Sequence, residues 1–215
     1  TDAIKFKKNS SMQLSIDHVS SGKSQADLSC GNTGAVMAIS LLKLRTVASI
    51  KRPSIASIWP NIKGESIVLD LGANIKNDTN SLIDNAILGS ALAKVLFSMA
   101  EPTVGLLNVG IEDMKGNENV QKASEILSEM SNKKQLNYYG FVEGADISNG
   151  KTNVVVTDGF TGNIALKTAE GTAFMVQSYF KKAFKSSIIS KLGYFFASLS
   201  LRTVRERLDP RVHNC

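Results

Sequence analysis

Residues 154–163 read Val-Val-Val-Thr-Asp-Gly-Phe-Thr-Gly-Asn. Such a short and entirely apolar run is typical of a central strand that is buried on both faces of a parallel sheet. The Asp, Thr, Asn and two Gly residues that follow are typical of a turn. Helical periodicity then predicts a long helix from Ile164 to about Phe184. A strand, a polar turn and a helix in this order are the repeating unit of an α/β fold.

The same order of elements recurs on both sides of this stretch. Strands are predicted at 26–29, 55–59, 66–71, 104–109, 136–142 and 154–156, and helices at 11–20, 36–44, 80–99, 119–130 and 164–184. Thr79 or Asn80 is the expected N-cap of the 80–99 helix. The alternation predicts a Rossmann-like α/β/α fold of three layers around a mostly parallel sheet. Residues 1–215 are expected to form a single domain.

The composition is typical of a globular protein with a hydrophobic core. With 43% hydrophobic residues among 215, the chain has enough apolar material for a real core. No run reaches the roughly 18 apolar residues that a membrane span needs, since the best candidate, 86–100, contains Lys94. The two cysteines, Cys30 and Cys215, lack metal-ligand spacing, so we expect a reduced, cytoplasmic protein with Cys30 packed as a small residue. The missing initiating Met and the abrupt end suggest that both termini are cuts.

The positive charge is concentrated near the end of the sequence. Residues 181–211 hold eight basic and two acidic residues, which accounts for the whole net charge of +6. This distribution predicts a local anionic partner and not a nucleic acid. Within 186–207, apolar and aromatic residues lie between the basic ones, and we expect a protruding helical hairpin or tip that touches an anionic membrane surface peripherally. The alternative is that the stripe packs in a dimer interface. The residues concerned are Leu192, Phe195, Phe196 and Leu199.

Small polar residues follow several of the predicted strands. These turns occupy residues 31–34, 70–74, 108–110 and 158–163. Ligands of open α/β sheets bind at the carboxyl ends of the strands, and glycine turns before helix N-termini suit anions. Two such turns predict a site for two parts of an anionic substrate. The alternative for any one of them is that it only connects a strand to a helix.

Charged residues near these turns are further candidates. Lys115 is expected to neutralise a phosphate, unless its loop is only a solvated surface, and Glu118 to cap the next helix. Lys167 follows the 158–163 turn and is expected to face the same pocket, with simple exposure on the helix as the alternative. The sequence has no Ser-His-Asp order, no G-x-S-x-G motif, no paired His site and no G-x-G-x-x-G motif. We therefore predict no metal and no cofactor, and an anion that is itself the nucleophile.

Six collinear motifs resemble the PlsX family of phosphate:acyl-carrier-protein acyltransferases. They are Lys8-Asn-Ser-Ser-Met12, Cys30-Gly-Asn-Thr-Gly-Ala35, Leu69-Asp-Leu-Gly-Ala-Asn74, Val104-Gly-Leu-Leu-Asn-Val-Gly110, Lys115-Gly-Asn-Glu118 and Asp158-Gly-Phe-Thr-Gly-Asn-Ile-Ala-Leu-Lys-Thr-Ala-Glu-Gly171. The resemblance implies a fold similar to isopropylmalate dehydrogenases and phosphotransacetylases, and a homodimer. It also implies transfer of a long-chain acyl group from acyl carrier protein to inorganic phosphate, which yields acyl-phosphate for phospholipid synthesis.

Under this resemblance we assign roles to the polar residues. Asn32, Thr33 and Gly34 with Thr161, Gly162 and Asn163 are the expected anion cradles. Lys115 and Lys167 are the expected charge stabilisers, and together with Asn163 they form the predicted catalytic set. Asn74, Asn108 and Glu143 are the expected orienting groups, and the rest of the predicted substrate-binding set is Asp70, Glu118 and Asp158.

Two rival functions remain open from the sequence. A short-chain phosphotransacetylase would share the fold but use coenzyme A thioesters. A non-catalytic fragment would only bind acyl carrier protein or membrane. Departures from the family pattern keep the second alternative open, because the glycine-rich opening segment and the Lys-Ser-His-Gly-like stretch near the end have no counterpart here.

Overall fold

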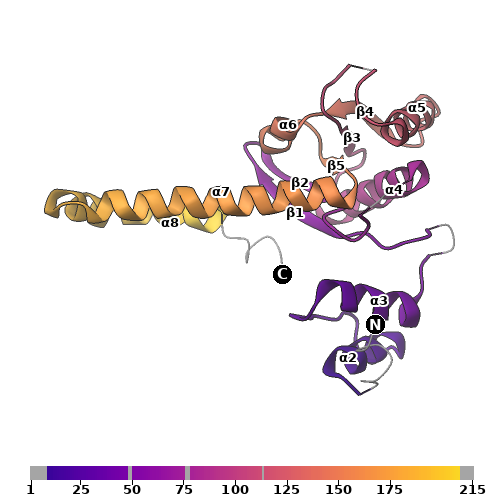
Figure 1. Ribbon diagram of the computed structural model, residues 1–215, viewed down its shortest axis with the longest axis horizontal. Coiled ribbons are helices and arrows are strands. Elements are labelled where there is room, and N and C mark those ends of the chain that lie inside the picture. Colours follow the sequence, from indigo (N-terminus) through magenta and orange to yellow (C-terminus); the bar gives the residue numbers. More distant parts are fainter. Residues whose placement is uncertain (1–8, 48–49, 76–77, 113, 209–215) are drawn as a thin grey trace. The chain divides into compact units, whose positions relative to one another are not determined.

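The computed structural model describes residues 9–47, 50–75, 78–112 and 114–208 (Figure 1). The chain divides into two compact units, Thr1–Ser54 and Ile55–Cys215. Each unit has its own elements, and the organisation of the whole chain as one domain stays a prediction.

Over residues 9–47 and 50–54, the structure of the first unit shows two helices. They are α2, Ser11–Ser20, and α3, Thr33–Leu44. Ile16 on α2 and Ile39 on α3 are buried, and an ion pair of 2.7 Å joins Asp17 to Lys43. The strand predicted at 26–29 is wrong: the segment has no regular structure and Leu28 is 77% exposed. A strand needs a neighbour for its backbone hydrogen bonds, and the described part of this unit contains no other strand. Cys30 is exposed, so its expected packing is also wrong.

The second unit contains a five-stranded sheet in the order β1-β2-β5-β3-β4. The strands are β1 Ala56–Asn61, β2 Gly64–Leu69, β3 Thr103–Leu107, β4 Asn137–Val142 and β5 Val154–Val156. β2, β5, β3 and β4 pair in parallel, while β1 runs antiparallel to β2 at one edge. The Val154–Val156 run is the centre of this sheet, which confirms the predicted, mostly parallel α/β fold.

Helices cover both faces of the sheet and complete the three layers. Because alternate strand residues point to opposite faces, Val154 and Val156 belong to one buried cluster and Val155 to another. The first cluster includes Leu82 of α4, Thr79–Leu96, and Leu127 of α5, Glu118–Asn132. The second includes residues of α6, Gly144–Asn149, and α7, Gly159–Lys185.

Several helix boundaries differ from the sequence prediction. The cap of α4 is Asp78, whose carboxylate accepts a hydrogen bond from the N–H of Ser81, so Thr79 and Asn80 lie inside the helix. Asn117, rather than Glu118, caps α5. α7 begins at Gly159, five residues earlier than predicted, because Asp158 is its N-cap. The short helix α6 was not predicted at all.

Beyond the sheet, α7 continues as a long projecting helix, and α8, Ile188–Leu208, returns along it (Figure 1). The rings of Phe184 and Tyr194 lie 5.3 Å apart between centroids and join the two helices. The protruding element is therefore a hairpin made by both helices, with its turn at Ser186 and Ser187, rather than by residues 186–207 alone. Among the described residues, no helix is long and apolar enough to cross a membrane.

Candidate functional site at the carboxyl edge of the sheet

The parallel strands place several predicted site residues at one edge of the sheet. Asp70 and Asn74 follow β2, Asp158 follows β5, Asn108 follows β3 and Glu143 follows β4. Since the four strands run parallel, their carboxyl ends share this edge. The topology thus brings together side chains that are up to 88 positions apart in the sequence, from Asp70 to Asp158.

The turn after β2 is organised by the carboxylate of Asp70, which is fully buried. Its Oδ1 accepts hydrogen bonds from the N–H groups of Ile55, Gly72 and Ala73, at 3.2, 3.1 and 2.8 Å. Its Oδ2 accepts from the N–H and the side-chain amide of Asn74, at 2.8 and 2.9 Å. Both carboxylate oxygens of Asp70 are therefore occupied by hydrogen bonds from the protein's own chain.

This turn lies directly against the first turn of α7. The N–H of Gly159 donates to the carbonyl oxygen of Asn74 at 3.0 Å. A Cβ at Gly162 would lie against the carbonyl oxygen of Asp70 and 2.8 Å from Cγ2 of Thr157. A Cβ at Gly72, where φ is +127°, would sit 3.4 Å from Cβ of Asn163. The two segments approach this closely only because glycines stand at the contact points.

The N-terminus of α7 already holds an anion, the carboxylate of Asp158. Its Oδ1 accepts the N–H of Thr161 at 2.9 Å and its Oδ2 accepts the Thr161 hydroxyl at 2.6 Å. A phosphate at this position would compete with Asp158 for the same donors. Thr161 is therefore part of a helix cap, and its predicted role as an anion ligand remains a prediction. Asn163 is exposed beside the turn after β2.

The loop after β3 is held by Asn108. Its side-chain amide donates to the carbonyl oxygen of Lys115 at 3.0 Å. The Lys115 ammonium lies 3.5 Å from the carboxylate of Glu112, and both side chains are exposed. A backbone hydrogen bond and then the charge of Lys115 lower the pKa of Glu112. Lys115 thus has an anionic partner within its own loop, which was not predicted although the spacing of three residues between Glu112 and Lys115 indicates the pair.

Glu118 and Lys167 are also exposed and form ion pairs on their own helices. Glu118 lies 2.5 Å from Lys122, and this hydrogen bond lowers the pKa of Glu118 and raises that of Lys122. Lys167 lies 2.7 Å from Glu170. Residues three or four positions apart are neighbours on a helix surface. Both ion pairs could therefore be predicted from the sequence. The side chains of Glu118 and Lys167 are 79% and 64% exposed.

Glu143 lies at the start of α6 after β4. Its N–H donates to the carboxylate of Asp146 at 2.9 Å, and the two side chains form a capping box. Burial raises the pKa of Asp146, but the Glu143 N–H and the nearby Lys151 ammonium, at 3.0 Å, together lower it. Glu143 is exposed at the carboxyl edge.

Asn32, Thr33 and Gly34 belong to the first unit. The Asn32 side chain accepts the N–H of Ala35 at 3.0 Å and caps α3, so this turn does begin a helix as expected. The three residues are exposed. Their meeting with residues 161–163 of the second unit stays a prediction.

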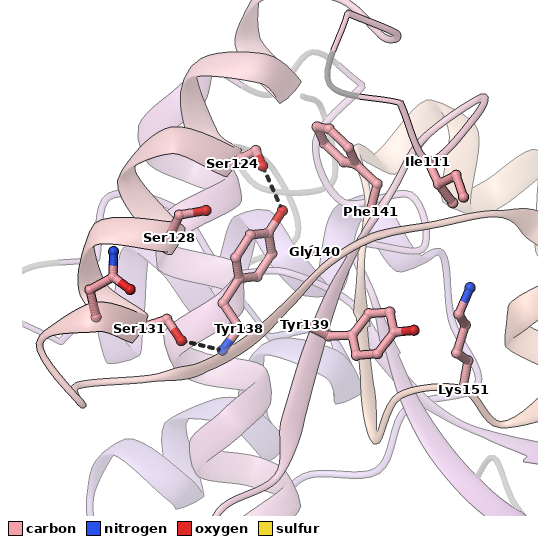
Figure 2. A pocket seen from close by; sticks show the side chains of 10 residues that line it. Ile111, Ser124, Ser128, Ser131, Tyr138, Tyr139, Gly140, Phe141 and Lys151 are labelled. Carbon is pink, nitrogen blue, oxygen red and sulfur yellow. Dashed lines mark hydrogen bonds between the residues drawn. The ribbon is translucent and has the colours of Figure 1, made fainter.

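A hollow of about 480 Å³ lies elsewhere, between α5 and the edge strand β4 (Figure 2). Its lining is rich in hydroxyl groups, and those of Ser124 and Tyr138 bond to one another at 2.9 Å. Lys151 lies 5.5 Å from the centre of the Tyr139 ring. None of the predicted site residues lines this hollow.

Chemically, the carboxyl edge offers amides, carboxylates and glycine turns. Within the described ranges, no group of three or more His, Cys, Asp or Glu residues is placed to hold a metal ion. Such an edge suits the binding and orientation of a substrate that carries its own nucleophile.

Solved structures with this fold include phosphotransacetylases. One from Streptococcus pyogenes has a TM-score of 0.57 at 20% identity and covers 75% of this chain and 55% of its own. Another from Staphylococcus aureus has a TM-score of 0.56 at the same identity and coverage. At this level of identity the likeness defines the fold class alone.

The chain belongs to the fatty acid synthesis protein family, which it matches over residues 1–215. It is 52% identical to the phosphate acyltransferase of Mesorhizobium japonicum over 200 residues, which cover 93% of this chain and 56% of that protein. It is 53% identical to the phosphate acyltransferase of Azorhizobium caulinodans over 205 residues, 95% of this chain and 58% of that protein. The chain therefore spans a little over half the length of these relatives. The resemblance to the PlsX family is confirmed.

Proposed function

We propose that the protein carrying this sequence transfers a long-chain acyl group from acyl carrier protein to inorganic phosphate. The observation that carries the proposal is the 52% identity to a phosphate acyltransferase across 93% of the chain. The carboxyl edge agrees with it, because amide side chains and glycine turns gather there.

In the proposed reaction a phosphate oxygen attacks the thioester carbonyl carbon. The carbon–sulfur bond breaks, acyl-phosphate forms, and the thiol of the carrier takes up a proton. The protein must hold the phosphate, orient the thioester and stabilise the oxyanion. We assign the orienting role to Asn163, which lies where α7 contacts the turn after β2. Asn74 supports this contact through its carbonyl oxygen, which accepts the N–H of Gly159. Lys167 and Lys115 are the proposed cations, which must leave Glu170 and Glu112 to reach the substrate.

The proposal predicts that turnover depends on phosphate. The full-length protein should consume long-chain acyl carrier protein when phosphate is present and stop when phosphate is omitted, as measured by release of the free carrier thiol. Equal turnover without phosphate would contradict the reaction. A strict preference for acetyl-coenzyme A would instead assign the protein to the short-chain phosphotransacetylases.

For the α7–α8 hairpin we propose peripheral contact with an anionic membrane from the cytoplasmic side. Large apolar side chains near its turn face solvent: Ile188 is 77% exposed, Ile189 82%, Phe195 72% and Phe196 80%. Lys181, Lys182, Lys185 and Lys191 lie beside them and are exposed. Apolar groups can enter the lipid interface while the cations meet anionic headgroups. The side chain of Leu199 lies outside the described part. The exposed Cys30 thiol agrees with a reducing compartment.

We also propose that the protein is a homodimer. The stem of the hairpin exposes Phe174, Tyr179 and Phe180 at 73%, 61% and 56%. An exposed apolar surface of this kind marks an interaction site. If the dimer covers the stem, the residues near the turn remain available to the membrane.

The membrane contact is testable with the double variant Leu192→Glu, Phe195→Glu. We expect the parent to co-sediment with anionic liposomes at low salt and to be released as salt rises, because screening weakens headgroup attraction. The double variant should stay in the supernatant. Thr172→Glu, Gln177→Glu makes the same change in charge at exposed polar positions of α7 and should still bind.

A parent that ignores anionic liposomes at low salt would contradict the membrane contact. Size-exclusion chromatography of the same variants separates the alternative. If the Leu192, Phe195 variant becomes monomeric, these residues belong to the dimer interface instead.

A further inference from the structure

Asp70 differs from the other acidic residues of the carboxyl edge because its side chain has no exposure to solvent. Its two oxygens accept five hydrogen bonds, four from backbone N–H groups and one from the Asn74 amide. A buried carboxylate is tolerated when hydrogen bonds replace its lost hydration. A substrate would have to displace these donors to reach it, so Asp70 is poorly placed to touch one.

The hydrogen bonds of Asp70 lead to the start of α7. Oδ2 fixes both the backbone and the side chain of Asn74, and the Asn74 carbonyl oxygen accepts the N–H of Gly159 at 3.0 Å. The carbonyl of Asp70 itself contacts Gly162. Its N–H donates to Thr157 at 3.1 Å, and the Thr157 N–H donates to Leu69 at 2.7 Å. The turn after β2 and the turn after β5 therefore form one connected structure.

We propose that Asp70 is a positioning residue: it holds the 71–74 turn against the N-terminus of α7 and so sets the place of Asn163 at the carboxyl edge. The inference rests on the proposed function, because it gives Asp70 a task in that site. It replaces the direct substrate contact that the sequence suggested for this residue. Asp70 acts through Asn74 and Gly159, and Asn163 is the group that meets the substrate.

Asp70→Asn in the full-length protein is the matched test. The amide keeps the size of the carboxylate but has one acceptor oxygen, so either Asn74 or the Ile55, Gly72 and Ala73 donors face an NH₂ group. Loss of reactant alignment of about 1 Å can cost about 100-fold in rate. We expect kcat to fall by about this factor while KM for phosphate changes little. Hydrogen exchange should be faster at the amides of Ala73 and Asn74 and unchanged in β5.

Ser66→Ala is the control for general destabilisation. Ser66 lies on β2, the strand that Asp70 follows, and is buried. Its hydroxyl donates to the carbonyl oxygen of Thr152 at 2.7 Å, nearer the amino end of the sheet. We expect it to lower the melting temperature and to leave kcat as in the parent. If Ser66→Ala and Asp70→Asn lower kcat equally at equal loss of stability, the effect is structural and the inference fails.

A second variant covers the case in which Asp70→Asn does not fold. Asn74→Ala removes the side-chain bond to Oδ2 and keeps the carboxylate. Positioning predicts a lower kcat at unchanged KM for phosphate, whereas a parent-like kcat overturns the inference. A parent that shows no phosphate-dependent turnover overturns the proposed reaction itself. An active parent with an equally active, folded Asp70→Asn variant overturns the inference alone.

Discussion

Replacing Gly162 with alanine is expected to lower the free energy of unfolding by about 3 kcal/mol, because overpacking a close contact forces the backbone to move. The new Cβ would lie against the carbonyl oxygen of Asp70, 3.0 Å from its carbonyl carbon and 2.8 Å from Cγ2 of Thr157. Two of these three atoms belong to the backbone, so no flexible side chain can simply rotate away. Chemical denaturation of the parent and the variant measures the effect.

Gly171→Ala is the matched control on the same helix. A Cβ at Gly171 meets nothing within 4 Å, and alanine in a helix interior is favoured over glycine by about 0.8 to 1 kcal/mol. We therefore expect this variant to be slightly more stable than the parent. If Gly162→Ala is as stable as Gly171→Ala, the close contact between α7 and the turn after β2 does not exist in solution.

Asn163→Ala and Lys167→Ala are expected to lower turnover by about 100-fold each, since an electrostatic contact in such a site contributes on the order of 3 kcal/mol to the transition state. Their thermal stability should change little, because both side chains are exposed. Steady-state kinetics and thermal melts of the full-length protein provide the two measurements.

Lys182→Ala removes an exposed cation much further along α7. In an assay without liposomes, this variant should keep the turnover of the parent. If Asn163→Ala or Lys167→Ala lowers the melting temperature but leaves the specific activity unchanged, the residue concerned has a structural role instead. For Lys167, Glu170→Gln gives a further check, because it removes the anion 2.7 Å away and should not lower activity.

The sheet was predictable because its strands have strong local signals. The apolar runs at 104–107 and 154–156 are buried on both faces, and glycine-bearing or polar turns follow them. The burial of Val154, Val155 and Val156 requires cover on both sides of the sheet, so the three layers follow from the same residues. Helix α2 was predicted with its observed bounds because Met12, Ile16 and Val19 recur at helical spacing. The structure adds that Ser10 caps this helix and that Ile16 is buried.

Other features depended on contacts that the sequence does not display. The 26–29 segment was predicted as a strand, but the described part of its unit contains no neighbouring strand for it to pair with. α6 has six residues, too few for a helical period to appear, and is held by the Glu143 and Asp146 capping box. At the site, residue types alone suggested that Asp70 and Thr161 bind substrate, whereas hydrogen bonds to their own chain occupy both side chains.

The central claim is that phosphate itself attacks the acyl thioester, and oxygen-18 phosphate tests it most directly. The full-length protein is incubated with long-chain acyl carrier protein and fully labelled phosphate, and the products are analysed by mass spectrometry. Direct attack predicts acyl-phosphate that retains all four oxygens of the labelled phosphate, because the carbon–sulfur bond is the one that breaks. Release of free fatty acid without labelled acyl-phosphate, at a rate that phosphate does not change, would contradict the account.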